Sequence, residues 1–109
     1  MVKNKVSATS LRAEVKRRLQ AAYGSRLKGV VLYGSEASGK SQPDSDIDLM
    51  VLIEGPISLW EEISRCVDAT YPIALETGRP NHAEPVDVQE YEKGEFALYR
   101  NARAEGILL

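Results

Sequence analysis

The chain has 109 residues, of which 43% are hydrophobic and 28% are charged, and its formal net charge is −2. These values are typical of one soluble globular domain over residues 1–109 and leave little room for a separate substrate-binding domain. The apolar runs are too short to span a bilayer, and no apolar stretch near the start resembles a secretion signal. We therefore expect a cytoplasmic protein with no membrane association.

The charges are unevenly distributed along the chain. Residues 1–40 contain nine Lys or Arg and two acidic residues, whereas residues 41–109 contain five and fourteen. This asymmetry can attract an anion to one side and cations to the other. Nucleic-acid binders usually combine a basic balance with interleaved aromatic residues, and the chain has neither, so direct nucleic-acid binding is not expected.

The first half of the chain predicts a helix, a strand, a loop and a second strand. A helix is expected from the candidate cap Ser10 to the stop at Gly24. A buried strand over residues 28–33 ends at Gly34, and a polar loop or short helix follows over residues 35–45. The next strand is expected over residues 46–53.

The second half predicts a helix, a strand and a last helix. Ser58 can cap the first of these helices, and Pro72 ends or kinks it. Its expected buried stripe is Leu59, Ile63, Cys66, Val67 and Tyr71. A loop over residues 78–86 then leads to a short edge strand near residues 83–88, and a last helix begins near Glu90 and stops before Gly106. The order αβ(loop)βαβα indicates an α/β fold.

Two carboxylates stand two residues apart where the second strand begins. Side chains alternate across a strand, so Asp46 and Asp48 project to one face while Ile47 and Leu49 pack on the other. Carboxylates this close repel each other unless a cation lies between them, and Mg²⁺ is the hard cation that carboxylates commonly share with phosphates. Acidic residues facing solvent at a strand end are the alternative.

A glycine-bounded loop, Gly34–Gly39, precedes this carboxylate pair. Gly34 lets the backbone approach a phosphate closely, and Ser35 adds a hydroxyl donor. Residues 34–41 also fit the G-x-x-x-x-G-K-S pattern of Walker-type sites. That pattern needs a following helix, whereas here a turn at Asp44 and Ser45 leads at once into a strand, which disfavours the Walker interpretation.

The segments Leu32–Gly39 and Pro43–Leu49 together resemble the signature of the polymerase-beta-type nucleotidyltransferase superfamily, in particular its minimal prokaryotic members. The segment Asn101–Leu109 is similar to the last helix of that family. The resemblance implies a small mixed sheet flanked by helices, two Mg²⁺ ions, and transfer of a nucleoside monophosphate from a triphosphate, with ATP as the expected substrate, to a hydroxyl.

The resemblance also implies roles for individual residues. Asp46 and Asp48 would hold the metals, and Gly34 and Ser35 the phosphates. The third carboxylate falls at Asp87, with Glu84 as the reserve candidate. Asp87 equally fits a helix cap, because Asp87-Val88-Gln89-Glu90 reads as a capping box.

Minimal members typically act as antitoxins that modify a tyrosine on a HEPN-type toxin, so a small helical protein is the expected partner. A binding domain without catalysis, and an enzyme with a small-molecule acceptor, remain alternatives. Many relatives carry a basic residue at the position of Ser38 and some carry one at that of Glu36, and Lys40 is the nearest substitute here. His82 is expected at the surface and Cys66 in the core. The apolar tail from Ile107 to Leu109 is a candidate interface for a homo- or hetero-oligomer.

Overall fold

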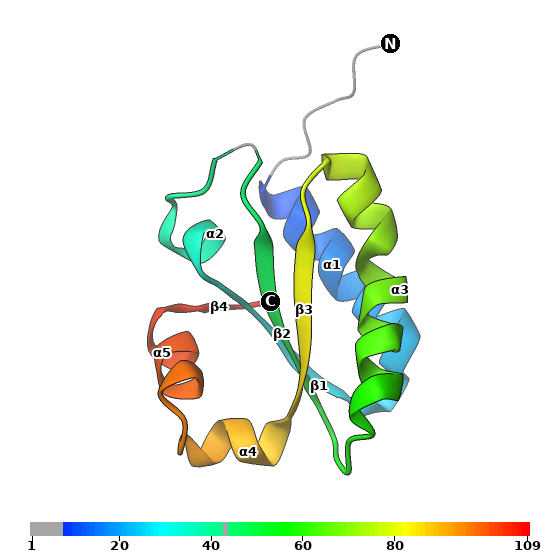
Figure 1. Ribbon diagram of the computed structural model, residues 1–109, viewed down its shortest axis with the longest axis vertical. Coiled ribbons are helices and arrows are strands. Elements are labelled where there is room, and N and C mark those ends of the chain that lie inside the picture. Colours follow the sequence, from blue (N-terminus) through cyan, green and yellow to red (C-terminus); the bar gives the residue numbers. More distant parts are fainter. Residues whose placement is uncertain (1–7, 43) are drawn as a thin grey trace.

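A mixed sheet forms the centre of the molecule (Figure 1). The computed structural model describes residues 8–42 and 44–109, and within these residues four strands pair in the order β3-β2-β1-β4. Along the chain the elements are α1 (Ala8–Tyr23), η1 (Gly24–Arg26), β1 (Leu27–Tyr33), α2 (Ser35–Ser38), β2 (Ile47–Ile53), α3 (Leu59–Thr77), β3 (Asn81–Asp87), α4 (Val88–Lys93), α5 (Ala97–Glu105) and β4 (Ile107–Leu108). The expected α/β fold with a small mixed sheet is confirmed.

The strand register aligns residues from three strands at one end of the sheet. β1 and β2 are antiparallel, and Tyr33 lies opposite Asp48. β2 and β3 are parallel because α3 crosses between them, and His82 lies opposite Asp48. Residues directly opposite each other share a face of the sheet, so these three residues form one row across it.

One face of the sheet is covered by α1 and α3 (Figure 1). On α1 the buried side chains recur every four residues, at Leu11, Val15, Leu19 and Tyr23. They meet alternate residues of β2, among them Ile47 and Leu49, which are 0% exposed. Burial of each such side chain contributes about 1.5–3 kcal/mol, so this face anchors the sheet.

The other face of the sheet packs against α4 and α5 and is less deeply covered. Val31, Met50, Leu52 and Val86 form a second cluster there with Tyr91 and Ala102. This cluster stops short of the end of the sheet that carries Asp46 and Asp48. Polar side chains therefore remain accessible beyond it.

The apolar tail completes the sheet. Residues Ile107–Leu108 form β4, which pairs with β1 through Leu32 opposite Ile107 and Val31 opposite Leu108. The amide of Leu109 donates a 2.8 Å hydrogen bond to the carbonyl of Val30. β4 thus occupies one edge of the sheet, and β3 occupies the other, as its proline content predicts.

Three local expectations are corrected. α1 begins at Ala8, so Ser10 lies inside the helix and is not its cap. α3 continues through Pro72 to Thr77, where Gly78 ends it in a left-handed conformation. The last helix is divided into α4 and α5, because Gly94 adopts a φ of 65° and ends α4.

The buried stripe of α3 is also displaced from the expected one. Glu62, Cys66, Thr70 and Ile73 are buried, whereas Leu59, Val67 and Tyr71 are 56%, 50% and 56% exposed. The expected core position of Cys66 is confirmed, and burial raises the pKa of its thiol. α3 carries more apolar residues than its inner face can bury, so a row of them faces outward.

None of the helices within the described ranges is long and apolar enough to cross a membrane.

Candidate active site

The carboxylate pair lies where β2 begins. Asp46 directly precedes the strand and Asp48 is its second residue. Ile47 and Leu49 are fully buried against α1 and α3, and strand alternation therefore directs Asp46 and Asp48 to the opposite face. Among the described residues, the side chain of Asp48 has no hydrogen-bond or ion-pair partner, so its charge is available to a ligand.

The glycine loop touches Asp48. Gly34 follows β1 with φ 73° and ψ −150°, a combination essentially restricted to glycine. A Cβ at this position would lie 2.5 Å from the Asp48 carboxylate oxygen Oδ2. The loop therefore lies directly against the Asp48 carboxylate.

Glu84 is the third carboxylate on this face. It lies opposite Met50, two residues along from the Asp48–His82 pair, and so it points to the same side of the sheet. Burial raises the pKa of Tyr33, and the negative charges of Glu84 and Asp48 raise it further. The Tyr33 hydroxyl is thus close enough to interact with a carboxylate of β2 and with a carboxylate of β3.

Asp87 does not join this group, and the expectation that it does is wrong. It pairs with Ile53 at the opposite end of β2, about 16 Å along the strand from Asp48. Its Oδ1 accepts a 2.9 Å hydrogen bond from the amide of Gln89 and caps α4. The helix-cap alternative therefore describes Asp87, and the reserve candidate Glu84 shares the sheet face of Asp48.

His82 lies beside Asp46. Its side chain is 65% exposed, in agreement with the expected surface position, and its Nε2 is 3.4 Å from the Asp46 Oδ2. Its proximity to the carboxylate pair follows from the parallel register of β2 and β3. Local sequence could not reveal this contact, because His82 and Asp46 are 36 residues apart.

Two cavities flank Tyr33. One, of about 400 Å³, is lined by residues of the glycine loop and α5: Tyr33, Gly34, Ser38, Lys40, Leu98, Asn101, Ala102 and Glu105. The other, of about 520 Å³, runs along β3 and α3 and is lined by Tyr33, Leu59, Ile63, Val67, Asn81, His82, Ala83, Glu84 and Pro85. Of the two residues expected near phosphates, Gly34 lines the first cavity and Ser35 lines neither. The second cavity is largely apolar, with Glu84 on its wall.

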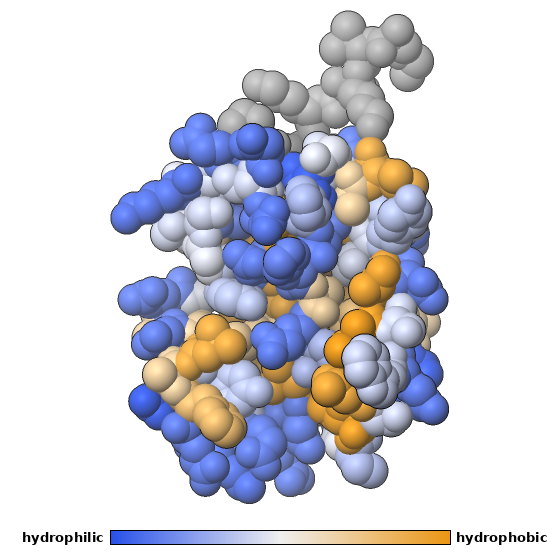
Figure 2. Space-filling view, viewed as in Figure 1, coloured by the Kyte–Doolittle hydropathy of each residue, from blue (hydrophilic) through white to orange (hydrophobic). Residues whose placement is uncertain are grey.

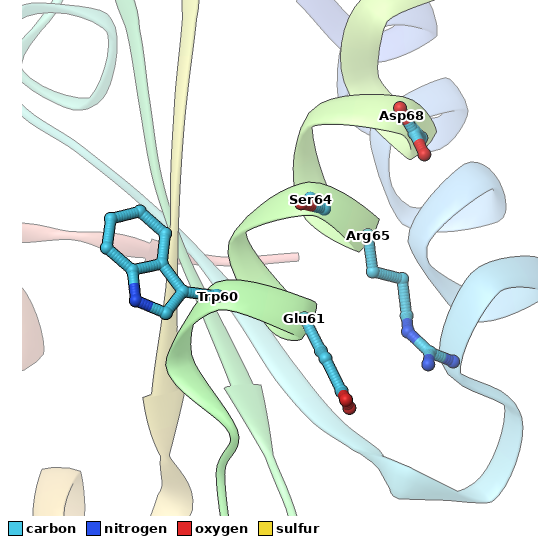
Figure 3. Close-up of a pocket in the computed structure, with 5 residues that line it drawn as sticks. All are labelled: Trp60, Glu61, Ser64, Arg65 and Asp68. Atoms are coloured by element: carbon cyan, nitrogen blue, oxygen red, sulfur yellow. The ribbon is translucent and has the colours of Figure 1, made fainter.

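A third cavity, of about 500 Å³, lies on α3 (Figure 3). Trp60 projects from one side of the helix, whereas Glu61 and Arg65 project from the other. None of the residues that line it belongs to the glycine loop or to the strand positions around Asp48. We therefore assign the candidate site to the two cavities that share Tyr33.

The residues at the site fit a divalent metal in their chemistry. Asp46, Asp48 and Glu84 offer the hard oxygen ligands that Mg²⁺ prefers. The absent side chain at Gly34 leaves space directly against Asp48. Within the described residues no group of three or more His, Cys, Asp and Glu is already gathered as a metal site, so the carboxylates would have to converge on an ion.

The arrangement of the strands and of the glycine loop beside Asp48 defines a polymerase-beta-like nucleotidyltransferase fold. The family model described as "Polymerase beta, Nucleotidyltransferase" matches residues 14–109, and the chain therefore belongs to this family. The match begins within α1 and covers every later helix and strand, including all those that contribute to the site. No curated protein matches the chain closely enough to count as a relative.

Proposed function

We propose that the chain transfers AMP from ATP to a tyrosine of a HEPN-type toxin in the cytoplasm and thereby acts as its antitoxin. The family membership supports nucleotidyl transfer in general. The observation that carries the proposal is the placement of a nucleotide-sized cavity and an apolar cavity on either side of Tyr33, with Gly34 on the wall of the first and Glu84 on the wall of the second.

The cavity beside Gly34 is the proposed nucleotide site. Gly34 and Ser35 would hold the phosphates through the loop backbone and the serine hydroxyl. Lys40 lines this cavity together with Ser38, so it can supply a cation although Glu36 and Ser38 carry no positive charge. Asn101 faces the same cavity from α5 and offers both a donor and an acceptor to a base.

The apolar cavity is the proposed acceptor site. Leu59, Ile63 and Val67 form an apolar wall that suits an aromatic side chain, and Glu84 lies on the same cavity. A small polar acceptor would gain little from this wall, whereas a tyrosine buries its ring and presents its hydroxyl to a carboxylate. Trp60 and Tyr71 are 80% and 56% exposed on α3 and can contact a protein partner. Figure 2 shows apolar surface on the part of the molecule that α3 occupies.

In the proposed reaction Glu84 accepts the proton of the tyrosine hydroxyl. The hydroxyl oxygen then forms a bond to the α-phosphorus while the bond from that phosphorus to the bridging oxygen of pyrophosphate breaks. Asp46 and Asp48 would hold the two Mg²⁺ ions, whose positive charge supports the attacking and leaving oxygens when they are bound. Positioning and electrostatics supply most of the catalysis in such transfers.

Label transfer to a partner tests the proposal. The full chain is incubated with Mg²⁺, ATP labelled at the α-phosphate and a small helical HEPN-type protein, and the label on the partner is followed by mass spectrometry. We expect one or more AMP units on a tyrosine. A stable complex without label would instead support a binding domain without catalysis, and label on a small molecule alone would support the third alternative.

Charged substitutions can show whether the two cavities have separate roles, one in binding the acceptor and the other in binding the nucleotide. Val67→Glu, in the apolar wall, should abolish transfer to the protein partner but leave the affinity for Mg²⁺-ATP unchanged. Leu108→Glu on the opposite edge strand is the matched control: it makes the same change from an exposed apolar residue to a charged one, and Leu108 is 71% exposed and lies outside both cavities. Equal loss of transfer in the two variants would argue against the acceptor cavity.

A further inference from the structure

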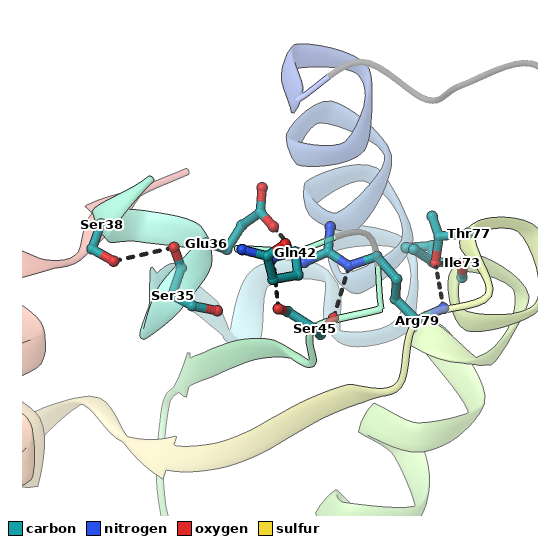
Figure 4. A network of polar contacts seen from close by, with 8 residues as sticks. All are labelled: Ser35, Glu36, Ser38, Gln42, Ser45, Ile73, Thr77 and Arg79. Carbon is teal, nitrogen blue, oxygen red and sulfur yellow. Dashed lines mark hydrogen bonds and ion pairs between the residues drawn. The ribbon is translucent and has the colours of Figure 1, made fainter. Parts of the chain in front are cut away.

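Arg79 connects the two halves of the site, and neither sequence pattern nor family resemblance points to it. It lies between α3 and β3, directly after Gly78. Its Nη2 is 2.5 Å from Oε1 of Glu36 in α2, and its Nε donates a 2.8 Å hydrogen bond to the carbonyl of Ser45 (Figure 4). One guanidinium thus contacts both the short helix within the glycine loop and the residue that precedes Asp46.

From this geometry we infer that Arg79 is a positioning residue, which fixes the distance between the phosphate-binding loop and the Asp46–Asp48 pair. The inference rests on the proposed function, since it assigns those two halves to one substrate. Arg79 touches neither cavity described above, so it acts through Glu36 and Ser45 rather than on a reacting atom.

The surroundings of Arg79 restrict its movement. The side chains of Arg79 and Glu36 are 13% and 10% exposed, so solvent screens their attraction less than it screens a surface ion pair. The amide of Arg79 donates a 3.2 Å hydrogen bond to the Thr77 hydroxyl, which itself donates to the carbonyl of Ile73. The backbone of Arg79 is thereby anchored to the end of α3.

Ser45, the residue before Asp46 that Arg79 contacts, is itself held by hydrogen bonds to Gln42. The amide of Ser45 donates to the carbonyl of Gln42 at 3.0 Å, and the amide of Gln42 donates to the Ser45 hydroxyl at 2.7 Å. Asp46 follows this turn, and the amide of Ile47 donates a 2.8 Å hydrogen bond to the carbonyl of Pro80. A shift of the turn would therefore shift Asp46 with it.

Glu36 gains a defined role from this contact. Some relatives carry a basic residue at this position, where the resemblance implies that it could contact phosphate. Here the acidic side chain turns to Arg79 and serves as the anchor on α2. The reversed charge is therefore compatible with an ordered phosphate loop.

Arg79→Lys tests the inference while keeping the positive charge. A guanidinium can bond two partners at once through its planar fork, whereas an ammonium is a single point on a flexible stem. We expect kcat/KM for nucleotidyl transfer to fall by about 10- to 100-fold, since small misplacements at a distance have effects of this size. The melting temperature should fall much less than for Arg79→Ala, which leaves Glu36 unpaired.

A second ion pair provides a matched control. At the other end of the sheet, Arg26 Nη2 lies 2.5 Å from Oε2 of Glu62 and also donates to the carbonyl of Glu54. Arg26→Lys makes the same chemical change in a pair that lines neither candidate cavity. It should lower stability to a similar extent and leave KM and kcat unchanged.

Amide hydrogen exchange gives a readout that does not depend on activity. Arg79→Lys should increase exchange at Lys40, whose amide bonds the Ser35 carbonyl in the glycine loop, and at Ser45 and Ile47 around Asp46, whereas Arg26→Lys should not. Unchanged exchange at both segments overturns the inference, as do kinetic effects that are equal in the two variants. If the wild-type chain neither binds Mg²⁺-ATP nor transfers AMP, the proposed function fails, and the exchange experiment still decides whether Arg79 positions the two segments.

Discussion

The two ends of β2 are built from the same components, yet only one of them carries the candidate site. At the first end Gly34 lies against Asp48, and at the second Gly55 lies against Asp87. An arginine–glutamate ion pair stands near each end: Arg79 with Glu36 and Arg26 with Glu62.

The ends differ in what their carboxylates bind. One carboxylate oxygen of Asp87 accepts a hydrogen bond from the amide of Gln89 at the start of α4. Asp48 has no such partner among the described residues and shares its face with Glu84. A glycine beside an aspartate is therefore not a sufficient signal, and the site is the end where the carboxylates remain available.

The largest expected effect comes from removing the charge at the first end. Asp48→Asn keeps the shape of the side chain, and it should reduce nucleotidyl transfer by about 10³-fold because several kcal/mol of transition-state stabilisation depend on a bound metal. The melting temperature should stay the same or rise, since carboxylate repulsion is relieved. Transfer rates and thermal melts measure both effects, and a variant with near wild-type activity would exclude Asp48 from the reaction.

Glu84 and Asp87 form the most direct test of the comparison. Glu84→Gln should lower kcat by about 10²-fold or more, as expected for loss of a general base. Asp87→Asn should leave transfer and stability nearly unchanged, because Asn is also a good helix cap, whereas Asp87→Ala should cost about 1 kcal/mol of unfolding free energy. Steady-state kinetics and urea denaturation distinguish these outcomes, and the reverse pattern of activities would return the catalytic role to Asp87.

The two glycines should respond differently to a methyl group. Gly34→Ala places a side chain in a backbone region that is essentially restricted to glycine, so it should cost about 1–3 kcal/mol and displace Asp48, with loss of transfer. Gly55 has no positive φ, and the three atoms nearest to its Cβ would all belong to the Asp87 carboxylate. Gly55→Ala should therefore weaken the α4 cap and leave transfer intact. Denaturation and label transfer are measured on both, and equal loss of activity would contradict the comparison.

The smallest expected effect is the loss of stability on removing the charge of Glu14, which forms surface ion pairs with Arg17 and Arg18. Hydrogen bonds from Arg17, together with Arg18, lower the pKa of Glu14 from 4.5 to about 2. Its folded-state pKa is depressed, so its contribution is complete above pH 4.5 and disappears as the pH falls towards 2. Glu14→Gln should cost less than about 1 kcal/mol at pH 7, and thermal melts should converge with those of the wild type in acid. A constant difference at all pH values would contradict this origin.

Much of the first end could be predicted from local sequence. Gly34 follows a short apolar strand, and the alternation around Ile47 and Leu49 fixes the face of Asp48, so both are properties of neighbouring residues. The third carboxylate depends instead on how β3 aligns with β2. That register is set by α3, which continues through Pro72 to Thr77 and brings β3 in at Asn81 rather than near residue 83.

The exposed row on α3 and the role of Arg79 could not be predicted for a related reason. Leu59, Val67 and Tyr71 fit a helical core pattern as well as the residues that are buried, and only the packing of α1 selects the inner face. Arg79 meets Glu36 from 43 positions away. Contacts of this kind depend on tertiary structure and leave no periodic signal in the sequence.

The contribution of α5 to the nucleotide cavity has a consequence for the order of synthesis. The glycine loop and all three carboxylates precede residue 85, whereas Leu98, Asn101 and Glu105 supply the opposite wall of the cavity, and β4 follows them. A nascent chain exposes its carboxylates well before it can enclose a nucleotide. Ribosome-bound chains that stop before α5 should therefore bind Mg²⁺-ATP only weakly, and the site matures only when the last segments have emerged.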